Sequence, residues 1–264
     1  MTSALVALRR DYAGYVDTFR NGQGELPAMM QLKLEHTAGV VGAARLIAQG
    51  EGFDETDARC AEAAALLHDT GRYEQLLRYN TFRDSDSVDH AVFSYEIVRS
   101  KGWLAAWPAR EREAVLEAVR MHNRRELPAG LAGLELKCAC AVRDADKLDI
   151  FRVLEERIKS TDWRHDARAF WNLPVNLPPD QEVVAAIRDG RPVDYQYIKS
   201  LADFVLVQVG WIRSGLVYTT SRRLCRDRGH LEFRRRFLRE LGAPPAADEL
   251  CALVDAEAER EFSL

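Results

Sequence analysis

Six residues of metal-binding type fall at positions that should face the interior of a helical protein. Each lies at helical spacing from apolar residues or at the end of an apolar run: His36, His68, Asp69, His90, His122 and Asp146. Burying an unpaired carboxylate costs several kcal/mol. Lysines and arginines do not occur on the same faces in matching number. A divalent metal would satisfy the carboxylates and the imidazoles together, so we predict a metal site.

Taken singly, members of this set have ordinary explanations. A lone inward histidine such as His122 is more often a hydrogen-bonded core residue than a ligand. Asp146 alone could be a charge on a helix surface. The joint pattern decides the interpretation, because five separate helices each direct such a residue toward the core.

Helical periodicity dominates the chain, and no segment is typical of a strand. The pattern predicts helices over about 4–20, 27–50, 57–69, 87–101, 108–122, 131–159 and 197–216, with arginine-rich helices after them. Gly71 is expected to end the third helix. The segment 161–192, rich in proline and tryptophan, is expected to form an irregular connection or lid. We predict an all-α metal-binding bundle over residues 1–160 and an accessory helical subdomain over 161–264 packed on it as one structural unit.

The order of the six residues resembles the HD-domain superfamily of metal-dependent phosphohydrolases. The doublet His68-Asp69 is followed by Thr-Gly-Arg, close to the family's His-Asp-x-Gly-Lys, and His36 precedes it by 32 residues. The segment RDADKLD, which carries Asp146, looks like the family's Ala-Asp-Lys segment. The resemblance spans residues 30–155, about half of the chain, and implies an HD-domain helical bundle with a C-terminal helical extension.

The resemblance also implies how the ligands are shared. The family's one-metal set corresponds to His36, His68, Asp69 and Asp146. Two-metal members, such as the HD-GYP phosphodiesterases, add two histidines in the interval where His90 and His122 stand, and their doublet aspartate bridges the metals. We therefore expect one or two divalent ions from among Mn, Fe, Co, Ni and Zn. The Gly-Tyr-Pro signature is absent, so the cyclic-dinucleotide substrate does not carry over.

The expected reaction is hydrolysis of a nucleotide or another small phosphate ester, either a monoester or a diester. Metal lowers the pKa of bound water toward about 7, and the metal-bound hydroxide attacks phosphorus in line. Asp69 would act as the bridging carboxylate. Arg72, in place of the family's lysine, and Lys147 are candidate phosphate contacts, with Arg124 and Arg125 after them. The plainer interpretation of these cations is an ordinary solvated charge.

Two other functions compete with hydrolysis. Some HD-fold proteins with two irons and this ligand set are oxygenases. A regulatory binding module with a decayed site is the third possibility, and the presence of all six ligand positions counts against decay.

Composition limits the partners. The chain has 264 residues, is 47% hydrophobic and carries a net charge of −4, which argues against a basic protein that coats nucleic acid. The five cysteines are scattered and odd in number, as expected for reduced thiols. The apolar start ends at Arg9, too early for a signal peptide, and the longest apolar stretch, 201–212, is too short for a membrane span. We expect a cytoplasmic protein with no membrane partner, and the sequence indicates no oligomeric state.

The remaining histidines and a late arginine cluster are expected at the surface. His165 and His230 lie in charged segments. Asp227, Glu232 and Glu240 interleave with the arginines of residues 222–239, which favours a solvated helix face over an anion or nucleic-acid contact.

Overall fold

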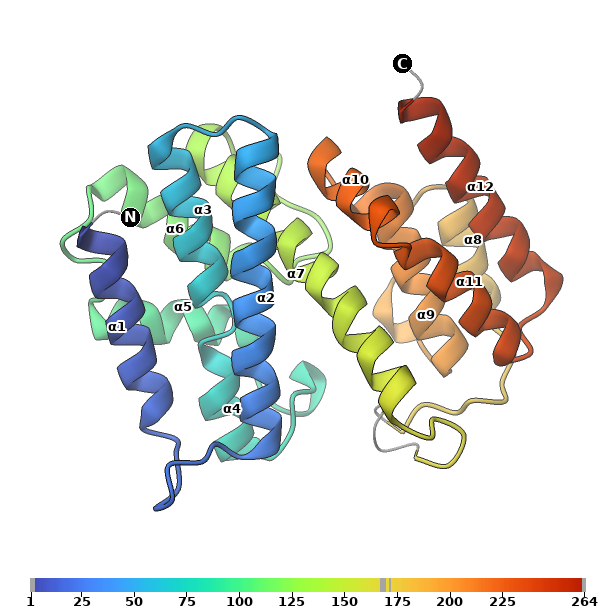
Figure 1. Cartoon of the computed structure of the whole chain (residues 1–264), viewed down its shortest axis with the longest axis horizontal. Helices are drawn as coiled ribbons and strands as arrows, with labels where there is room; N and C mark the ends of the chain where they lie inside the picture. Colours follow the sequence, from blue (N-terminus) through green and yellow to red (C-terminus); the bar gives the residue numbers. More distant parts are fainter. Residues whose placement is uncertain (1–2, 167–169, 171, 263–264) are drawn as a thin grey trace. The chain divides into compact units, whose positions relative to one another are not determined.

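The computed structural model describes residues 3–166, 170 and 172–262. These residues form helices and connecting turns without any strand, which confirms the all-α prediction (Figure 1). The chain divides into two compact units, Met1–Asp149 and Ile150–Leu264. The sequence-based division at residue 160 falls at the last residue of the helix that crosses this boundary and stays a prediction. No helix of the described residues has the length and apolar character that a membrane span requires.

Unit 1 is a bundle built around a buried central helix. Its elements are α1 (Ser3–Asp17), α2 (Ala28–Gly50), α3 (Glu55–Leu67), α4 (Gly71–Tyr79), the short 3₁₀ helix η1 (Asp84–Asp86), α5 (His90–Lys101), α6 (Ala109–Met121) and the first part of α7 (Gly133–Ser160). Helix α3 packs against α1, α2 and α6, and every residue from Cys60 to Leu67 is buried. The alanines in this run allow the neighbouring helices to approach closely on all sides.

The connection between α3 and α4 corrects the role expected of Gly71. Helix α3 ends at Leu67, and Gly71 begins α4 rather than ending α3. A Cβ atom at Gly71 would lie 2.8 Å from the backbone nitrogen of Ser94 and 3.0 Å from the carbonyl oxygen of His90. Glycine is therefore required by the close approach of α4 to α5, a tertiary contact that local sequence does not reveal.

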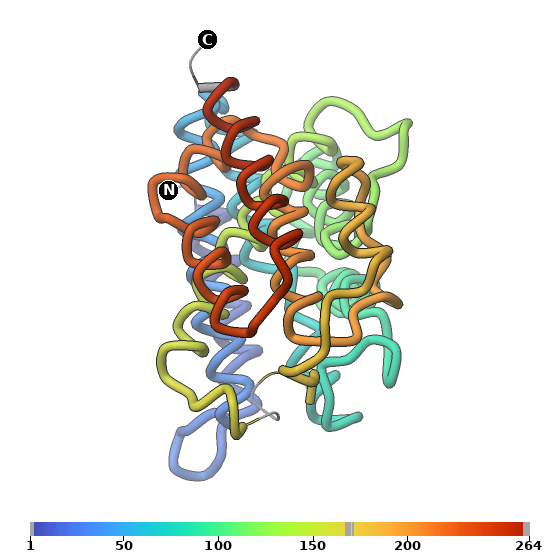
Figure 2. The backbone as a smooth tube through the Cα atoms, turned by 90° about the vertical axis from the view of Figure 1, so that its right-hand side faces the viewer, coloured from blue at the N-terminus to red at the C-terminus, as the bar shows by residue number. Residues whose placement is uncertain are grey.

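Unit 2 contains the end of α7 and the helices that follow. These are α8 (Gln181–Arg188), η3 (Tyr195–Tyr197), α9 (Leu201–Gly210), the π-helical turn η4 (Trp211–Gly215), α10 (Thr219–Asp227), α11 (His230–Glu240) and α12 (Pro245–Phe262). Figure 2 shows α11 and α12 side by side, joined by a short turn. Helix α9 is buried on nearly all sides and forms the middle of this unit's core.

Two sequence-based expectations for unit 2 need correction. Helix α8 occupies part of the segment expected to be irregular, because Asp180 caps it by accepting a hydrogen bond from the backbone of Glu182. The helix expected over 197–216 begins only at Leu201, where the Ser200 hydroxyl accepts the backbone N–H of Asp203 at 3.0 Å. Residues 167–169 and 171 of the expected lid lie outside the described residues.

The expectation that His230 and all the late arginines lie at the surface is wrong. His230 and Arg234 stand one turn apart on α11 and are both buried. His230 Nδ1 lies 2.6 Å and Arg234 Nη1 2.7 Å from the same carboxylate oxygen of Glu155, and Arg234 Nη2 donates to Gln208 Oε1 at 2.7 Å. The guanidinium also lies 4.3 Å from the centre of the Phe151 ring. His165 is exposed, as expected.

Removing Arg234 should destabilise the protein strongly. The Arg234→Ala variant leaves the buried Glu155 without its guanidinium, and loss of one partner of a buried ion pair costs about 3–5 kcal/mol. Arg236→Ala, on the exposed side of the same helix, is the control and should change stability by less than about 0.5 kcal/mol. Denaturant unfolding of both variants measures the difference. Equal stability would show that the buried cluster contributes little.

Candidate metal centre

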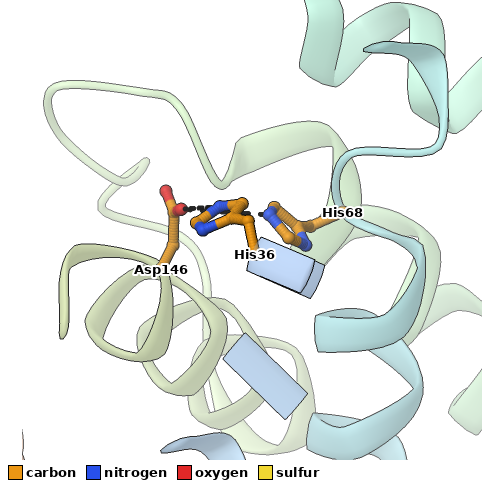
Figure 3. A group of neighbouring side chains, drawn as sticks. All are labelled: His36, His68 and Asp146. Atoms are coloured by element: carbon orange, nitrogen blue, oxygen red, sulfur yellow. Dashed lines mark hydrogen bonds and ion pairs between the residues drawn. The ribbon is translucent and has the colours of Figure 1, made fainter. Parts of the chain in front are cut away.

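His36 lies between two carboxylates of α7. Its side chain projects from α2 and is buried. His36 Nε2 is 3.0 Å from Asp146 Oδ1, and Nδ1 is 2.7 Å from Asp149 Oδ2. Figure 3 shows the ring of His36 between Asp146 and His68. Burial alone would lower the pKa of His36, but the hydrogen bonds to both carboxylates outweigh it and raise the pKa.

The His68-Asp69 doublet lies directly after the last residue of α3. His68 Nδ1 donates to the carbonyl of Ala65 at 2.8 Å, in the last turn, where a helix leaves carbonyls without helical donors. Its Nε2 is buried and has no hydrogen-bond partner among the residues that the structure describes. That atom lies 3.5 Å from Asp69 Oδ2 and 3.8 Å from Asp146 Oδ1. Burial lowers the pKa of His68 to about 4, so the ring is neutral at pH 7.

His90 and His122 form the other half of the site. His90 is the first residue of α5, and its Nδ1 lies 2.5 Å from Asp84 Oδ2. His122 follows the last residue of α6, and its Nδ1 donates to the carbonyl of Val119 at 2.8 Å. The two Nε2 atoms are 3.0 Å apart, and each lies 3.7 Å from Asp69 Oδ1. Burial, and then the nearby Arg72, lower the pKa of His90 to about 4.

All four histidines turn the same nitrogen toward the site. Carbonyls and ionised carboxylates only accept hydrogen bonds, so in His68, His90 and His122 the Nδ1 atoms carry the protons and the Nε2 lone pairs point inward. Both ring nitrogens of His36 face a carboxylate, Asp149 at Nδ1 and Asp146 at Nε2. The facing lone pairs of His90 and His122 would repel each other without a cation near them. The unpartnered Nε2 of His68 has the same requirement. The donor set therefore fits divalent metal: His68 belongs both to a group with His36 and Asp146 and to a group with Asp69 and His122. His90 forms a further group with Asp84 and Asp89.

Asp69 lies between the two groups. Its Oδ2 faces His68 and, at 3.8 Å, His36, whereas its Oδ1 faces His90 and His122. Lys33 Nζ lies 2.7 Å from Oδ2. Burial by itself would raise the pKa of Asp69, but Lys33 and His68 hold it well below its ordinary value. The carboxylate is therefore ionised and available to a cation.

The structure gives the candidate phosphate contacts different surroundings. Arg72 Nε lies 3.5 Å from Asp69 Oδ1, while its Nη1 donates to Gln75 Oε1, the Phe82 carbonyl and Asp84 Oδ1. Lys147 Nζ donates to the carbonyl of Arg143 at 3.2 Å, and burial lowers the pKa of Lys147 to about 8. Of the last two, Arg124 pairs with Asp89 at 3.5 Å and Arg125 is exposed. Arg72 is thus the predicted cation that the structure brings nearest to Asp69.

Sequence reasoning missed three residues of the site. Lys33 stands three residues before His36, and Asp149 stands three residues after Asp146, so each shares a helix face with a predicted ligand. That spacing could have revealed both. Asp84 belongs to the short η1 helix in the loop after α4, where no periodicity indicates which way a side chain points.

Comparison with known proteins gives one family. Residues 34–150 match the family model described as HD domain, and this range contains all six predicted ligands. No curated protein and no solved structure matches the chain.

Divalent metal should stabilise the folded protein. At a hundredfold excess of free metal over its Kd, binding to the native state adds about 2.7 kcal/mol. The gain should be largely lost in His68→Gln, which removes a buried Nε2, and retained in the control His165→Gln, which changes an exposed histidine. Thermal unfolding with and without Mn²⁺, followed by chelator, measures the effect. An equal gain in both variants would contradict the assignment of His68 as a ligand.

Proposed function

We propose, from the match of residues 34–150 to the HD-domain family model, that the protein is a metal-dependent phosphohydrolase of the cytoplasm. Its substrate is a nucleotide or another small phosphate ester. The observation that carries the proposal is that the Nε2 atoms of four histidines converge on Asp69 and Asp146. The Nδ1 atom of each of these histidines is hydrogen-bonded to an acceptor on the side away from the site. The five cysteines are buried free thiols, as in proteins of a reducing compartment.

We propose that the site holds two metal ions. His36, His68, Asp69 and Asp146 would hold the first. His90 and His122 would hold the second, with Asp69 shared between them. The distances from the two oxygens of Asp69 to the two histidine groups support a bridging role. Imidazole with carboxylate suits Mn, Fe, Co, Ni or Zn.

The chemistry follows from charge. Bound divalent metal acidifies water and offsets the negative charge on phosphate oxygens. Lys33 and Arg72 lie beside Asp69 and would contact the phosphate. Once a cation engages Asp69, the Lys33 ammonium loses part of its attraction to that carboxylate and becomes available to the substrate. Arg72 offers its Nε, which has no hydrogen-bond partner in the described residues.

Lys147 has less support as a phosphate contact. Its ammonium is bonded to the backbone of its own helix, although it follows Asp146 directly. Burial lowers the pKa of Lys147 to about 8, so part of the population is neutral near that pH and the side chain is a weaker anion ligand than an arginine. We retain it behind Lys33 and Arg72.

Purified protein should release phosphate from at least one member of a panel of nucleotides and small phosphate esters, and only with divalent metal present. Asp69→Ala should lower both bound metal and hydrolysis to background, because it removes the carboxylate that faces both histidine groups. Phosphate release and elemental analysis measure the two effects. Iron in the purified protein together with oxygen uptake, and no phosphate release, would instead identify a diiron oxygenase. Metal binding with neither activity would favour a regulatory module.

The number of metals can be tested separately. Replacing His90 and His122 together by Gln should leave a folded protein with one metal, whereas the unmodified protein should bind two, about 3.5–4 Å apart. Metal stoichiometry on saturated protein, or anomalous scattering from a crystal, gives the count. One metal in the unmodified protein, with both histidines turned away from it, would refute the two-metal arrangement and leave the HD assignment intact.

A further inference from the structure

Helix α7 contacts His36 through both of its ring nitrogens. Asp146 and Asp149 are three residues apart, so they project from the same face of the helix. Asp146 approaches Nε2 at 3.0 Å, on the side of the other metal ligands, and Asp149 approaches Nδ1 at 2.7 Å, on the opposite side. The two carboxylates therefore bracket one imidazole, and only Asp146 belongs to the predicted ligand set.

The space for Asp149 depends on a glycine of α2. Gly39 stands one turn after His36, and a Cβ atom there would lie 1.9 Å from Asp149 Oδ1 and 2.5 Å from its Cγ. Such an overlap cannot be relieved while the carboxylate stays in place. Gly42, one turn further along α2, has nothing within 4 Å of the same hypothetical atom. A glycine inside a helix costs about 1 kcal/mol relative to alanine, and Gly39 has a packing reason for that cost where Gly42 has none.

We propose that Asp149 is a positioning residue for metal binding and that Gly39 provides the space it needs. Asp149 accepts the Nδ1 proton of His36, and so keeps the Nε2 lone pair directed at the metal. Without Asp149, the carboxylate left against the ring would be Asp146, on Nε2. It would draw the proton to that nitrogen and block its use as a ligand. The inference rests on the metal role of His36 in the proposed function, and does not depend on the reaction.

The Asp149 carboxylate should affect the metal-binding strength of its histidine more than the backbone carbonyls that accept from His68 and His122. Asp149 is a buried carboxylate behind the His36 ring, so it increases the basicity of the bound nitrogen as well as fixing the ring. His90 has a carboxylate behind it as well, but Asp84 is partly exposed and lies on a surface loop. Of the four histidines, His36 is consequently the one whose Nδ1 faces a buried carboxylate.

Metal affinity tests this inference. Co²⁺ is titrated into metal-free full-length protein that carries His90→Gln and His122→Gln, which remove the ligands of the second metal. Visible absorption then follows only the metal at His36. Asp149→Ala and Gly39→Ala should each weaken binding about 10–100-fold, the usual cost of losing such a support. Both should also change the absorption spectrum of bound Co²⁺, because the geometry of one ligand changes. Gly42→Ala, the matched control, should bind as the parent does.

A double variant separates the proposed route from a general packing defect. In Asp149→Ala there is no carboxylate for a new side chain to displace, so adding Gly39→Ala should cost little further affinity. Losses that add in full would overturn the link between Gly39 and Asp149. If Asp149→Ala does not fold, Gly39→Ala alone decides, since alanine favours the helix, and parent-like affinity with an unchanged spectrum would overturn the proposal.

The result can be told apart from failure of the proposed function. Weakened Co²⁺ binding in these variants, together with an unmodified protein that hydrolyses no phosphate ester, would refute the phosphohydrolase and support the inference. Parent-like Co²⁺ binding by Asp149→Ala, in a protein that does release phosphate, would refute the inference alone.

Discussion

The ionised carboxylate of Asp69, buried at the end of α3, sets a condition that the surrounding helices meet. Two cations offset its desolvation, Lys33 from α2 at Oδ2 and Arg72 from α4 at Oδ1. The imidazoles of His90 and His122 also face Oδ1. Arg72, His90 and His122 each stand at or directly beside a helix end, whereas Lys33 lies within α2. The small side chains of α3 and the glycine at the start of α4 bring those helix ends close together. The helices of unit 1 thus surround the buried carboxylate of Asp69.

The sequence predicts the six proposed ligands and the helical class because both leave a periodic signal. His36 and Asp146 lie on apolar helix faces, and the doublet follows an apolar run, so pattern alone indicates that they point inward. Gly71 was misplaced because its role is a contact between helices distant from its local pattern. Asp84 was missed because a short loop helix carries no period. The HD-domain match agrees with the resemblance read from the motifs, and the substrate stays a proposal.

Unit 2 shows the limit of charge patterns. Helix α11 carries four arginines together with Glu232 and Glu240, which suggests a solvated face, yet His230 and Arg234 turn inward to Glu155. The methylene groups of an arginine are apolar and its guanidinium has several donors, so an arginine can be buried where hydrogen-bond acceptors surround the guanidinium. Here Gln208 and Glu155 supply them from α9 and α7. Composition cannot separate the buried positions from the exposed ones, because the partners come from other helices.

The acceptors behind the four histidines differ in how they would respond to mutation. His68 and His122 donate to main-chain oxygens, which every substitution at Ala65 or Val119 would leave in the chain. His36 and His90 donate to side chains that one codon change can delete. Random mutagenesis of the residues that accept these Nδ1 hydrogen bonds would therefore damage the site unevenly. In each half of the site, one histidine has an acceptor that mutation cannot remove and the other has an acceptor that it can. Gradual loss of the site by neutral mutation would therefore begin at His36 or His90, whose acceptors are side chains. It would not begin at His68 or His122, whose acceptors are main-chain carbonyls that every residue has.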